Sequence, residues 1–518
     1  MTRSGQLNKL DSQKDFDIII IGGGATGLGC AVDAASRGYR TLLMEKYDFA
    51  KGTSSRATKL VHGGVRYLAQ GNIRLVREAL LERGRLLENA PHVCHRLAFV
   101  VPFYNIWQKW FYGIGLWWYE YLSAHLSLGK TKSLTKKQTL NLLPDLSDKK
   151  LKGSVLYYDG QFDDSRLAIN LAQTAETLGA VVLNYFTVNG FIKNNGKISG
   201  VQATDELNHR KYELKAKVII NATGVFSDSV LQLAENHQEE TIAPSQGIHL
   251  VVEKFFFKGD AALMIPKTDD GRVLFVIPWH NKLLLGTTDT PVSVIATEPR
   301  PLKEEIDFIL NHFNRYASSI INNSDVKSVF VGLRPLAKTK AKVNTAVMPR
   351  DHQIKILPSG LVHVTGGKWT TYRSMAEHAV NVAIHSVRLK RKAGKTKRLK
   401  IHGWTKNRTD NHLSVYGSDA VAIQRMIDSD MALAEKIHPR FPYTIAEVKW
   451  GIENEMAMTV EDVLARRIRL LFLDAGAAIE AAPKVSHCFV KWGGATEELA
   501  RQQVVDFVNL ANGYWVEP

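Results

Sequence analysis

Residues 16–27 read FDIIIIGGGATG and decide the first part of the fold. The apolar first half predicts a buried strand, and glycines at positions 22, 24 and 27 follow it at once with GxGxxG spacing. A helical stretch follows over 28–37, and a second strand over 40–44 ends in Glu45. A strand, a glycine turn, a helix and a second strand with a terminal acid are typical of a Rossmann-type dinucleotide-binding unit.

Each of these positions has a physical role in holding a dinucleotide. Gly22 permits the tight turn, Gly24 lets the pyrophosphate approach the backbone, and Gly27 lets helix and strand pack closely. The helix N-terminus offers N–H groups and positive potential to phosphate. We expect Glu45 to accept hydrogen bonds from the adenosine ribose hydroxyls. The alternative is a glycine-rich turn without a ligand, which the complete unit makes the weaker interpretation.

Two later strand ends also carry glycine. The strand 217–221 leads to Gly224, and the strand 361–364 leads to Gly366 and Gly367, with a helix after them. Backbone N–H groups at such a turn are suited to face a flavin ring. Each turn alone would be ordinary, but three in this order favour a large cofactor that spans the sheet, and hence FAD.

The composition is that of a globular protein with excess positive charge. The 518 residues include 67 Lys and Arg against 51 Asp and Glu, a net charge of +16. This charge favours nucleic acid, anionic lipid or phosphorylated substrates as partners, with general solubility as an equal explanation. Cys30, Cys94 and Cys488 are scattered, which argues against a disulfide framework and a zinc site, so no metal is expected. No stretch is long and apolar enough to predict a spanning helix.

The chain divides into an α/β region and a helical region. Short β-branched runs alternate with helical stretches before residue 390, which indicates an α/β architecture. Residues 1–15 are expected to be an N-terminal tail. The basic run 388–400 predicts a solvated linker, with contact to anionic lipid as the alternative. Residues 401–518 predict a helical C-terminal domain, in which 459–475 form one capped helix.

One segment is much more specific than the rest. GTSSRATKLVHGGVRYL, residues 52–68, resembles the signature of FAD-dependent glycerol-3-phosphate dehydrogenases, which are DAO-type flavoprotein oxidoreductases. The resemblance continues through VREALLERGRLLENAPH, VLFVIPW, LLLGTTDT, VGLRPL, MPRDH and VTGGKWTTYR, and it covers residues 16–390. It implies oxidation of sn-glycerol 3-phosphate to dihydroxyacetone phosphate by hydride transfer to FAD, with the electrons passed to a membrane quinone.

The resemblance implies two interleaved domains within residues 16–390. The FAD-binding domain is expected over 16–105, 150–245 and 340–390. A substrate domain with a mainly antiparallel β-sheet is expected over 106–149 and 246–339. Within that sheet, 273–278 and 282–286 predict a hairpin.

The resemblance also assigns residues to the cofactor and to the substrate. The cofactor positions are Gly22, Gly24, Gly27, Glu45, Thr53, Ser54, Lys59, His62, Gly63, Gly64, Gly224, Gly366 and Gly367. The substrate positions are Arg66, Tyr67, Thr287, Arg334, Arg350 and Lys368, and the catalytic positions are His249 and Arg334. Arginine suits a phosphate because its planar fork donates two parallel hydrogen bonds. A neutral histidine suits proton abstraction from the C2 hydroxyl near neutral pH.

Ordinary structural roles compete with several of these assignments. Arg334 could form a surface ion pair, and Tyr67 could be a half-buried core aromatic. For His249, a satisfied core residue and a base are equally weighted. His62 is expected to hold its loop rather than to take part in chemistry.

The stretch 103–124 is rich in Trp and Tyr, and Lys109 and Glu120 interrupt it. This aromatic density predicts a helix lying in the lipid interface, with a buried helix under the substrate domain as the alternative. We therefore expect a peripheral protein on the cytoplasmic side of the cell membrane, with an anionic lipid surface as a partner. A homodimer is compatible with the sequence.

Two other functions compete with this interpretation. A soluble oxidase of the same fold would give electrons to oxygen and release peroxide, but the aromatic stretch argues against it. An RNA-binding flavoprotein would use the positive charge. The chain has no RNP motif and no basic–aromatic interleaving, so no nucleic-acid partner is expected.

Overall fold

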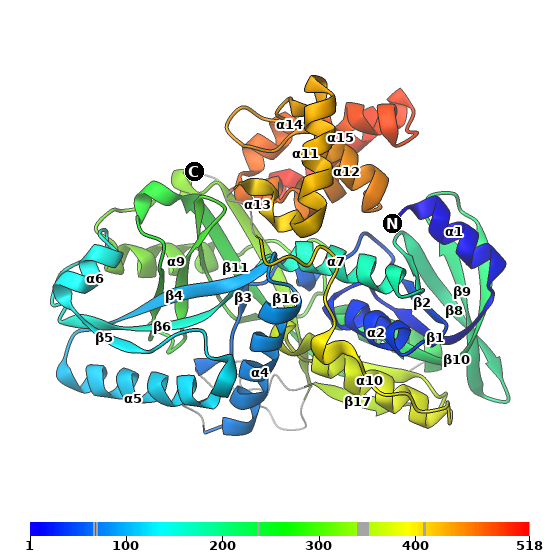
Figure 1. The fold of residues 1–518 in the computed structure, drawn as a ribbon, viewed down its shortest axis with the longest axis horizontal. Helices are drawn as coiled ribbons and strands as arrows, with labels where there is room; N and C mark the ends of the chain where they lie inside the picture. The colour runs from blue at the N-terminus through cyan, green and yellow to red at the C-terminus, as the bar shows by residue number, and fades with distance from the viewer. Residues whose placement is uncertain (66–67, 69–70, 236–238, 339–351, 408–410, 517–518) are drawn as a thin grey trace.

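The computed structural model describes the chain except residues 66–67, 69–70, 236–238, 339–351, 408–410 and 517–518. Two β-sheets lie side by side, and the C-terminal helices pack above them (Figure 1). The predicted fold class is confirmed: an α/β protein with a Rossmann-type domain, a mainly antiparallel second sheet and a helical C-terminal region.

The first sheet contains the predicted βαβ unit. Its strand order is β17-β18-β10-β1-β2-β7, and the β8–β9 hairpin pairs with β10. The strands are β1 (Asp15–Ile21), β2 (Thr41–Met44), β7 (Val181–Leu183), β8 (Phe186–Asn194), β9 (Lys197–Asp205), β10 (Lys211–Asn221), β17 (Gln353–Ile356) and β18 (Val362–Thr365). β1 pairs in parallel with β2 and β10, and β10 in parallel with β18. The carboxyl ends of these strands therefore meet at one edge, where open α/β sheets bind ligands.

Both faces of this sheet are covered, which explains the unbroken isoleucine run of β1. Ile18 and Ile20 lie in one core with α2 (Ala25–Ser36), α7 (Asp164–Thr177) and α10 (Tyr372–Ser386). Ile19 and Ile21 lie in the opposite core with α1 (Arg3–Ser12) and α8 (Ser227–Glu235). Alternate residues of one strand thus anchor two helical layers.

Two segments that the sequence predicts to be loosely held are packed instead. Within residues 1–15, expected as a tail, Arg3–Ser12 form α1, and Arg3 donates to Asp205 at 2.6 Å. The segment 388–400, expected as a solvated linker, accepts hydrogen bonds on its backbone, including one from Tyr39 Oη to Lys390 O at 2.6 Å. Its charged side chains still reach solvent. Composition therefore predicts a solvated segment and does not reveal the hydrogen bonds that its backbone accepts.

The second sheet is mainly antiparallel, as predicted. Its order is β15-β11-β14-β13-β12-β4-β6-β3, with β16 on β11 and β5 on β6. The strands are β3 (Leu60–Val61), β4 (Cys94–Phe103), β5 (Lys132–Thr135), β6 (Gly153–Phe162), β11 (Ile242–Glu253), β12 (Ala262–Ile265), β13 (Leu274–Trp279), β14 (Lys282–Gly286), β15 (Thr290–Pro291) and β16 (Ser328–Ala337). The predicted hairpin is β13–β14, and the β12–β4 pair is parallel.

The boundary between the two sheets differs from the expected one. β3, β4 and β6 belong to the second sheet, although the sequence places 16–105 and 150–245 in the FAD-binding domain. β4 and β6 pair along their whole length, from Cys94 opposite Phe162 to Phe103 opposite Gly153. Buried strands of either sheet have similar apolar sequences, so local pattern does not say which sheet a strand joins.

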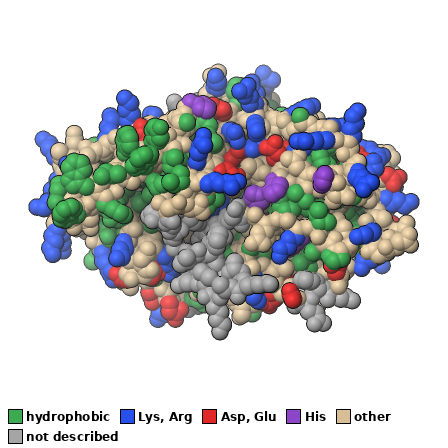
Figure 2. Space-filling view, turned by 90° about the horizontal axis from the view of Figure 1, so that it is seen from below, with side chains coloured by type: hydrophobic (Ala, Val, Ile, Leu, Met, Phe, Trp, Pro, Cys, Tyr) green, Lys and Arg blue, Asp and Glu red, His purple; other side chains and the backbone are tan. Residues whose placement is uncertain are grey.

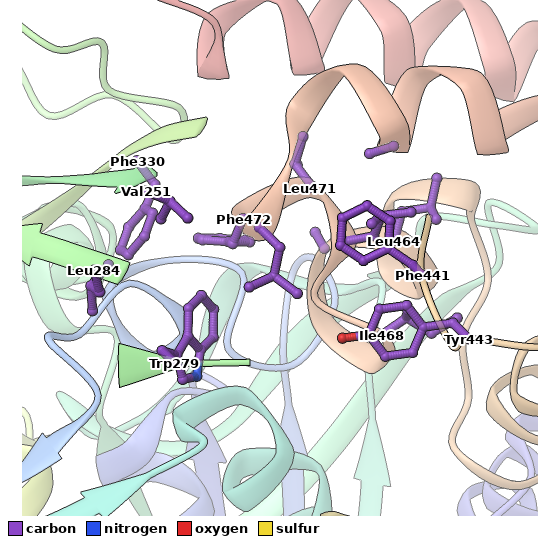
Figure 3. Packing of buried hydrophobic residues seen from close by; sticks show 14 of the residues in the cluster. Val251, Trp279, Leu284, Phe330, Phe441, Tyr443, Leu464, Ile468, Leu471 and Phe472 are labelled. Carbon is purple, nitrogen blue, oxygen red and sulfur yellow. The ribbon is translucent and has the colours of Figure 1, made fainter. Parts of the chain in front are cut away.

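Helices cover the second sheet on both faces. α6 (Lys136–Leu142) and α9 (Lys303–Tyr316) accompany one core, and α4 (Ile73–Asn89), α5 (Ile106–Leu122) and the C-terminal helices share the other. The C-terminal helices are α11 (Ala420–Ser429), α12 (Ile445–Asn454), α13 (Leu470–Leu473), α14 (Ala475–Trp492) and α15 (Glu497–Ala511). Phe472 of α13 packs on Phe330 of β16 with ring centroids 4.9 Å apart, beside Trp279 (Figure 3). A shared core therefore joins the C-terminal domain to the substrate sheet.

The segment 459–475 is not the single helix that the sequence predicts. It contains a π-helix over Asp462–Arg467, then Arg469 in the left-handed region at φ 72°, and then α13. The described part of the chain contains no helix with both the length and the apolar character needed to cross a bilayer.

Candidate functional site

A cavity of about 670 Å³ opens where the two sheets meet. It is lined by the carboxyl ends of β1, β2, β10 and β18 from the first sheet and by β11 and β16 from the second. Ligand pockets in proteins usually measure about 300–1,000 Å³. The cavity is thus large enough for a cofactor and lies where the strand topology predicts one.

At the first sheet the glycine turn between β1 and α2 forms part of the cavity wall. Gly22 has φ +110°, and a Cβ there would lie 2.7 Å from Ala222 O. A Cβ on Gly27 would lie 1.8 Å from Gly22 O, so α2 can approach β1 only with glycine at this position. Gly24 caps α2 without a side-chain oxygen and lines the cavity together with Gly22. This close approach of bare backbone fits the pyrophosphate of a dinucleotide.

Glu45 lies at the end of β2 and lines the same part of the cavity. Its carboxylate accepts hydrogen bonds from Gly23 N at 2.6 Å and from Tyr47 N at 2.9 Å. Loss of water around the group raises its pKa above the usual glutamate value, and the two backbone donors oppose that shift. The carboxylate therefore supports the glycine turn at the cavity wall, and its hydrogen bonding to ribose hydroxyls stays a prediction.

The turn Thr53–Ser55 connects the two sheets at the cavity wall. Ser54 Oγ accepts from Ala25 N at the start of α2 at 2.9 Å, and Ser54 O accepts from Trp369 Nε1 at 2.9 Å. Thr53 Oγ1 donates to Leu333 O of β16 at 2.6 Å. Both residues line the cavity with Gly224, Gly366 and Gly367, as the resemblance implies for cofactor contacts.

Other residues of the signature support the wall rather than form it. Lys59 is completely buried, and its Nζ donates to Asp164 at 2.8 and 2.7 Å and to Ser55 O at 2.8 Å. Gly63 N donates to Tyr119 Oη at 2.6 Å. Lys59, Gly63 and Gly64 are outside the cavity lining, whereas His62 is part of it. Direct cofactor contact by these three residues stays a prediction.

At the second sheet the cavity is bounded by charged and polar side chains. Arg334 on β16 donates to Thr287 Oγ1 at 3.2 Å, to Thr288 O at 2.8 Å and to Asp289 Oδ1 at 3.1 Å. A Cβ on Gly247 would lie 2.2 Å from Arg334 Nη2, so the glycine makes room for the guanidinium. These contacts aim the guanidinium at the cavity, which Lys368 also lines after β18.

His249 lies on β11, opposite Gly286 and Phe330 in the neighbouring strands. Its Nε2 is hydrogen-bonded to Thr58 Oγ1 at 2.9 Å, and its ring stacks on Phe330 with centroids 5.0 Å apart. Burial, together with the positive charges of Lys59 and Arg334, lowers the pKa of His249 well below its usual value. The imidazole is therefore neutral at physiological pH, which leaves one ring nitrogen unprotonated.

The structure places His249, Arg334 and Lys368 in one cavity with Gly22, Gly24, Gly224, Gly366 and Gly367. Thr287 is outside the cavity lining and accepts a hydrogen bond from Arg334. Arg66, Tyr67 and Arg350 lie outside the described residues. Sequence reasoning missed Asp289 and Thr58, which hold Arg334 and His249. Both occur in the quoted motifs, but only the fold shows which side chain each of them meets.

The predicted aromatic helix is α5, and most of its aromatic side chains are exposed. Trp107 and Phe111 are 81% and 69% exposed, and Trp110, Trp117 and Trp118 are also exposed. The opposite side of α5 is buried, and Tyr119 Oη donates to Asp159 at 2.6 Å. The hydrophobic area at the left of Figure 2 lies over this helix. The alternative of a helix wholly buried under the substrate domain is therefore wrong.

Comparisons with known proteins agree with this geometry. Residues 17–381 match the family model described as FAD dependent oxidoreductase, and residues 361–498 match the C-terminal domain of alpha-glycerophosphate oxidase. The chain is 37% identical to the mitochondrial glycerol-3-phosphate dehydrogenase of Rattus norvegicus, over 99% of this chain and 76% of that protein. It is 38% identical to the Homo sapiens enzyme of the same name, over 93% and 71%.

A solved structure extends the similarity to three dimensions. The glycerol-3-phosphate dehydrogenase from Bacillus halodurans, complexed with FAD, matches with a TM-score of 0.80 and 28% identity, over 99% of this chain and 97% of that one. The glycine cradle and the cavity described above fit the cofactor that this relative carries. The chain belongs to the family of FAD-dependent glycerol-3-phosphate dehydrogenases, within the DAO-type flavoprotein oxidoreductases.

Proposed function

We propose that this protein oxidises sn-glycerol 3-phosphate to dihydroxyacetone phosphate and passes the electrons to a membrane quinone. One observation carries the proposal: a neutral buried histidine and two cationic side chains, Arg334 and Lys368, line the same cavity as the glycine cradle. A small phosphate dianion with a secondary alcohol requires cations at one end and a proton acceptor at the other. This combination is what the two sheets supply at their junction.

Arg334 is the principal phosphate ligand in this proposal. Its guanidinium is oriented by Thr287, Thr288 and Asp289, so little rotamer freedom remains to be lost when an anion arrives. Lys368 adds a second positive charge from the turn after β18. We expect the phosphate to be bound between them, with Thr287 as a further donor.

His249 takes the proton of the C2 hydroxyl, and Thr58 keeps the imidazole ring in place. Arg334 is one of the charges that depress the pKa of His249. A bound phosphate dianion offsets that positive charge, so substrate binding raises the basicity of His249 when a base is needed. Bound FAD supplies the hydride acceptor for C2 in this scheme.

The experiment is anaerobic addition of glycerol 3-phosphate to the purified holoprotein, followed by the visible flavin absorbance. We expect the absorbance to be lost, and glycerol without phosphate to leave it nearly unchanged. Equal reduction by glycerol would remove the phosphate site from the proposal. A holoprotein that keeps its oxidised spectrum with either compound would contradict the function.

Oxygen is the alternative electron acceptor. The match of residues 361–498 to a domain named after an oxidase gives this alternative some weight. The exposed aromatic face of α5 favours the quinone, because it would bring the protein to the membrane where quinone resides. After anaerobic reduction, the flavin should be reoxidised faster by vesicles that contain quinone than by oxygen. Rapid reoxidation by oxygen with stoichiometric peroxide would favour the oxidase.

We also propose that α5 attaches the protein peripherally to the cytoplasmic side of the cell membrane. Aromatic rings gain from burial in the interface while their N–H and O–H groups stay wet, and the net charge of +16 adds attraction to anionic lipid. Replacing Trp110, Trp117 and Trp118 by Ser should release the protein from anionic vesicles and leave flavin reduction intact. Met431→Ser, at an exposed apolar position of the C-terminal domain, is the matched control.

A triple variant that still sediments with vesicles would place the attachment elsewhere. A triple variant that loses FAD would show that these three tryptophans are needed for the fold. We do not expect this result, because the three side chains are exposed on the outer side of α5.

A further inference from the structure

The segment 461–469 of the C-terminal domain reaches across to the cofactor-binding domain with three arginines. Arg466 and Arg467 lie in the π-helix Asp462–Arg467. Arg469 precedes α13 and has left-handed backbone angles. All three side chains are buried. π-helical turns are rare and occur frequently at functional sites. Here the irregular backbone lets neighbouring arginines point at the same part of another domain.

The first anchor point is Asp48, a fully buried carboxylate between β2 and the turn Thr53–Ser55. It accepts from Arg466 Nε at 2.5 Å and from Arg467 Nη1 and Nη2 at 2.6 and 2.9 Å. The two guanidiniums hold the pKa of Asp48 well below its usual range despite burial. Lys46, Tyr47, Ala50, Lys51 and Gly52, which surround Asp48 in sequence, all line the cofactor cavity.

Two further anchor points lie on the same loop. Lys51 Nζ is 2.5 Å from Glu461 Oε1 of the C-terminal domain and 2.9 Å from Glu298 Oε1. Arg469 Nη2 donates to Ser55 O at 2.9 Å and to Asp164 Oδ1 at 3.1 Å. Ser55 follows the cavity-lining residue Ser54. The loop 45–55 is therefore held from outside at its beginning, middle and end.

The C-terminal domain is attached to the rest of the protein by more than these ion pairs. The apolar contact of Phe472 with Phe330 and the neighbouring core already join it to the substrate sheet (Figure 3). Buried ion pairs are weak evidence for net stability, because desolvation opposes the Coulomb attraction, and in some proteins they specify a geometry instead. In this molecule the ion pairs and hydrogen bonds of the three arginines and Glu461 meet the loop beside Glu45.

We propose that the C-terminal domain is a positioning device for the cofactor loop: Arg466, Arg467 and Arg469, with Glu461, hold residues 45–55 in the shape that retains FAD. These residues act through the loop and do not touch the cofactor themselves. The inference rests on FAD binding and not on the identity of the substrate, so its failure and that of the proposed function are distinguishable.

The test uses full-length apoprotein titrated with FAD, with binding followed by the quenching of flavin fluorescence. Asp48→Asn should weaken FAD binding at least tenfold, and Glu461→Gln, which keeps the side-chain shape, should weaken it several-fold. Glu435→Gln removes an exposed ion pair with Lys484 in the same domain and should leave FAD affinity unchanged.

A second measurement separates positioning from general stability. Amide hydrogen exchange over 45–55 should rise in Glu461→Gln and stay at the wild-type level in Glu435→Gln. If Glu461→Gln lowers only the thermal midpoint of the apoprotein while FAD affinity and exchange over 45–55 stay unchanged, the network is purely structural and the proposal is overturned. If Asp48→Asn fails to fold, Glu461→Gln alone decides by the same criteria.

Discussion

The two ends of the main cavity are built by opposite means. At the first sheet the wall is backbone: Gly22 and Gly24 line the cavity without side chains, and Gly27 lets α2 pack closely against the turn after β1. At the second sheet, side chains do it: Arg334 and His249 project from antiparallel strands and are held by neighbouring polar groups. One end should therefore be destroyed by adding an atom, and the other by removing a charge.

The difference also suits the two ligands that we propose for the two ends, FAD at the first sheet and the phosphorylated substrate at the second. Parallel strands end together, so their backbone N–H groups and helix N-terminus converge on a phosphate without any charged side chain. Antiparallel strands present side chains on one face at alternate positions, which suits a small substrate that needs particular functional groups. The comparison predicts that damage at one end leaves binding at the other end intact.

The largest effect is expected at the glycine end, which is the end of the cavity formed by the first sheet. Gly27→Ala places a Cβ 1.8 Å from Gly22 O, a distance that requires α2 to move away from β1. We expect the purified protein to lose nearly all bound FAD, measured as the ratio of flavin to protein. Gly113→Ala, in α5 with open space around the added atom, should keep a full complement. Normal FAD content in Gly27→Ala would refute the close-packing argument.

The next largest effect is expected at the charged end, which is the end of the cavity formed by the second sheet. Arg334→Ala removes charge-assisted hydrogen bonds, each worth about 1.5–3 kcal/mol, so kcat/KM for glycerol 3-phosphate should fall roughly 10- to 150-fold. FAD content should not change. Arg315→Ala breaks an exposed pair with Asp269 and should have almost no effect on either quantity. Loss of FAD in Arg334→Ala would break the separation between the two ends.

The sequence alone was sufficient for the glycine end because its residues are neighbours in the chain. The strand, the glycines, the helix and Glu45 fall within 16–45, and local spacing predicts their arrangement. The charged end required the family resemblance, since Arg334 and His249 carry no local signal that separates them from a surface ion pair or a core histidine. The structure then added Asp289 and Thr58, which orient them.

Contacts between distant segments could not be predicted. Lys59 is outside the cavity lining, and its partner Asp164 lies 105 residues away in the chain, so the sequence around Lys59 does not indicate this contact. Asp48 and Arg467 are separated by 419 residues, and nothing near either of them in sequence indicates the other. Such pairs depend on tertiary packing, which composition and periodicity do not encode.

A smaller effect is expected from Glu45→Gln, which tests whether charge matters at the glycine end. Both carboxylate oxygens accept from backbone N–H groups, so the amide nitrogen of glutamine would face a donor. Losing one such hydrogen bond costs about 1 kcal/mol, so FAD should bind about fivefold to tenfold more weakly. Glu206→Gln, exposed after β9 in the same sheet, is the control. An unchanged affinity would mean that only the glycines hold this end.

The smallest effect is expected from pH, acting through His249 at the charged end. Its folded-state pKa lies well below 6.5, whereas in the unfolded chain it is ordinary. Above pH 6.5 both states are neutral and the full stability is present. As the pH falls below 6.5, His249 becomes protonated in the unfolded chain but stays neutral in the folded protein. The free energy of unfolding therefore decreases by up to about 1.4 kcal/mol per pH unit. His92, whose burial lowers its pKa to about 4, destabilises the fold in the same direction. Because wild type and His249→Gln both contain His92, its contribution cancels when the two are compared. Thermal midpoints of the apoprotein from pH 7 to pH 5 should therefore fall more steeply for wild type than for His249→Gln, by the equivalent of about 1–2 kcal/mol. Parallel curves would mean that His249 titrates normally in the fold, and the charged end would then lack the neutral base on which the proposed reaction depends.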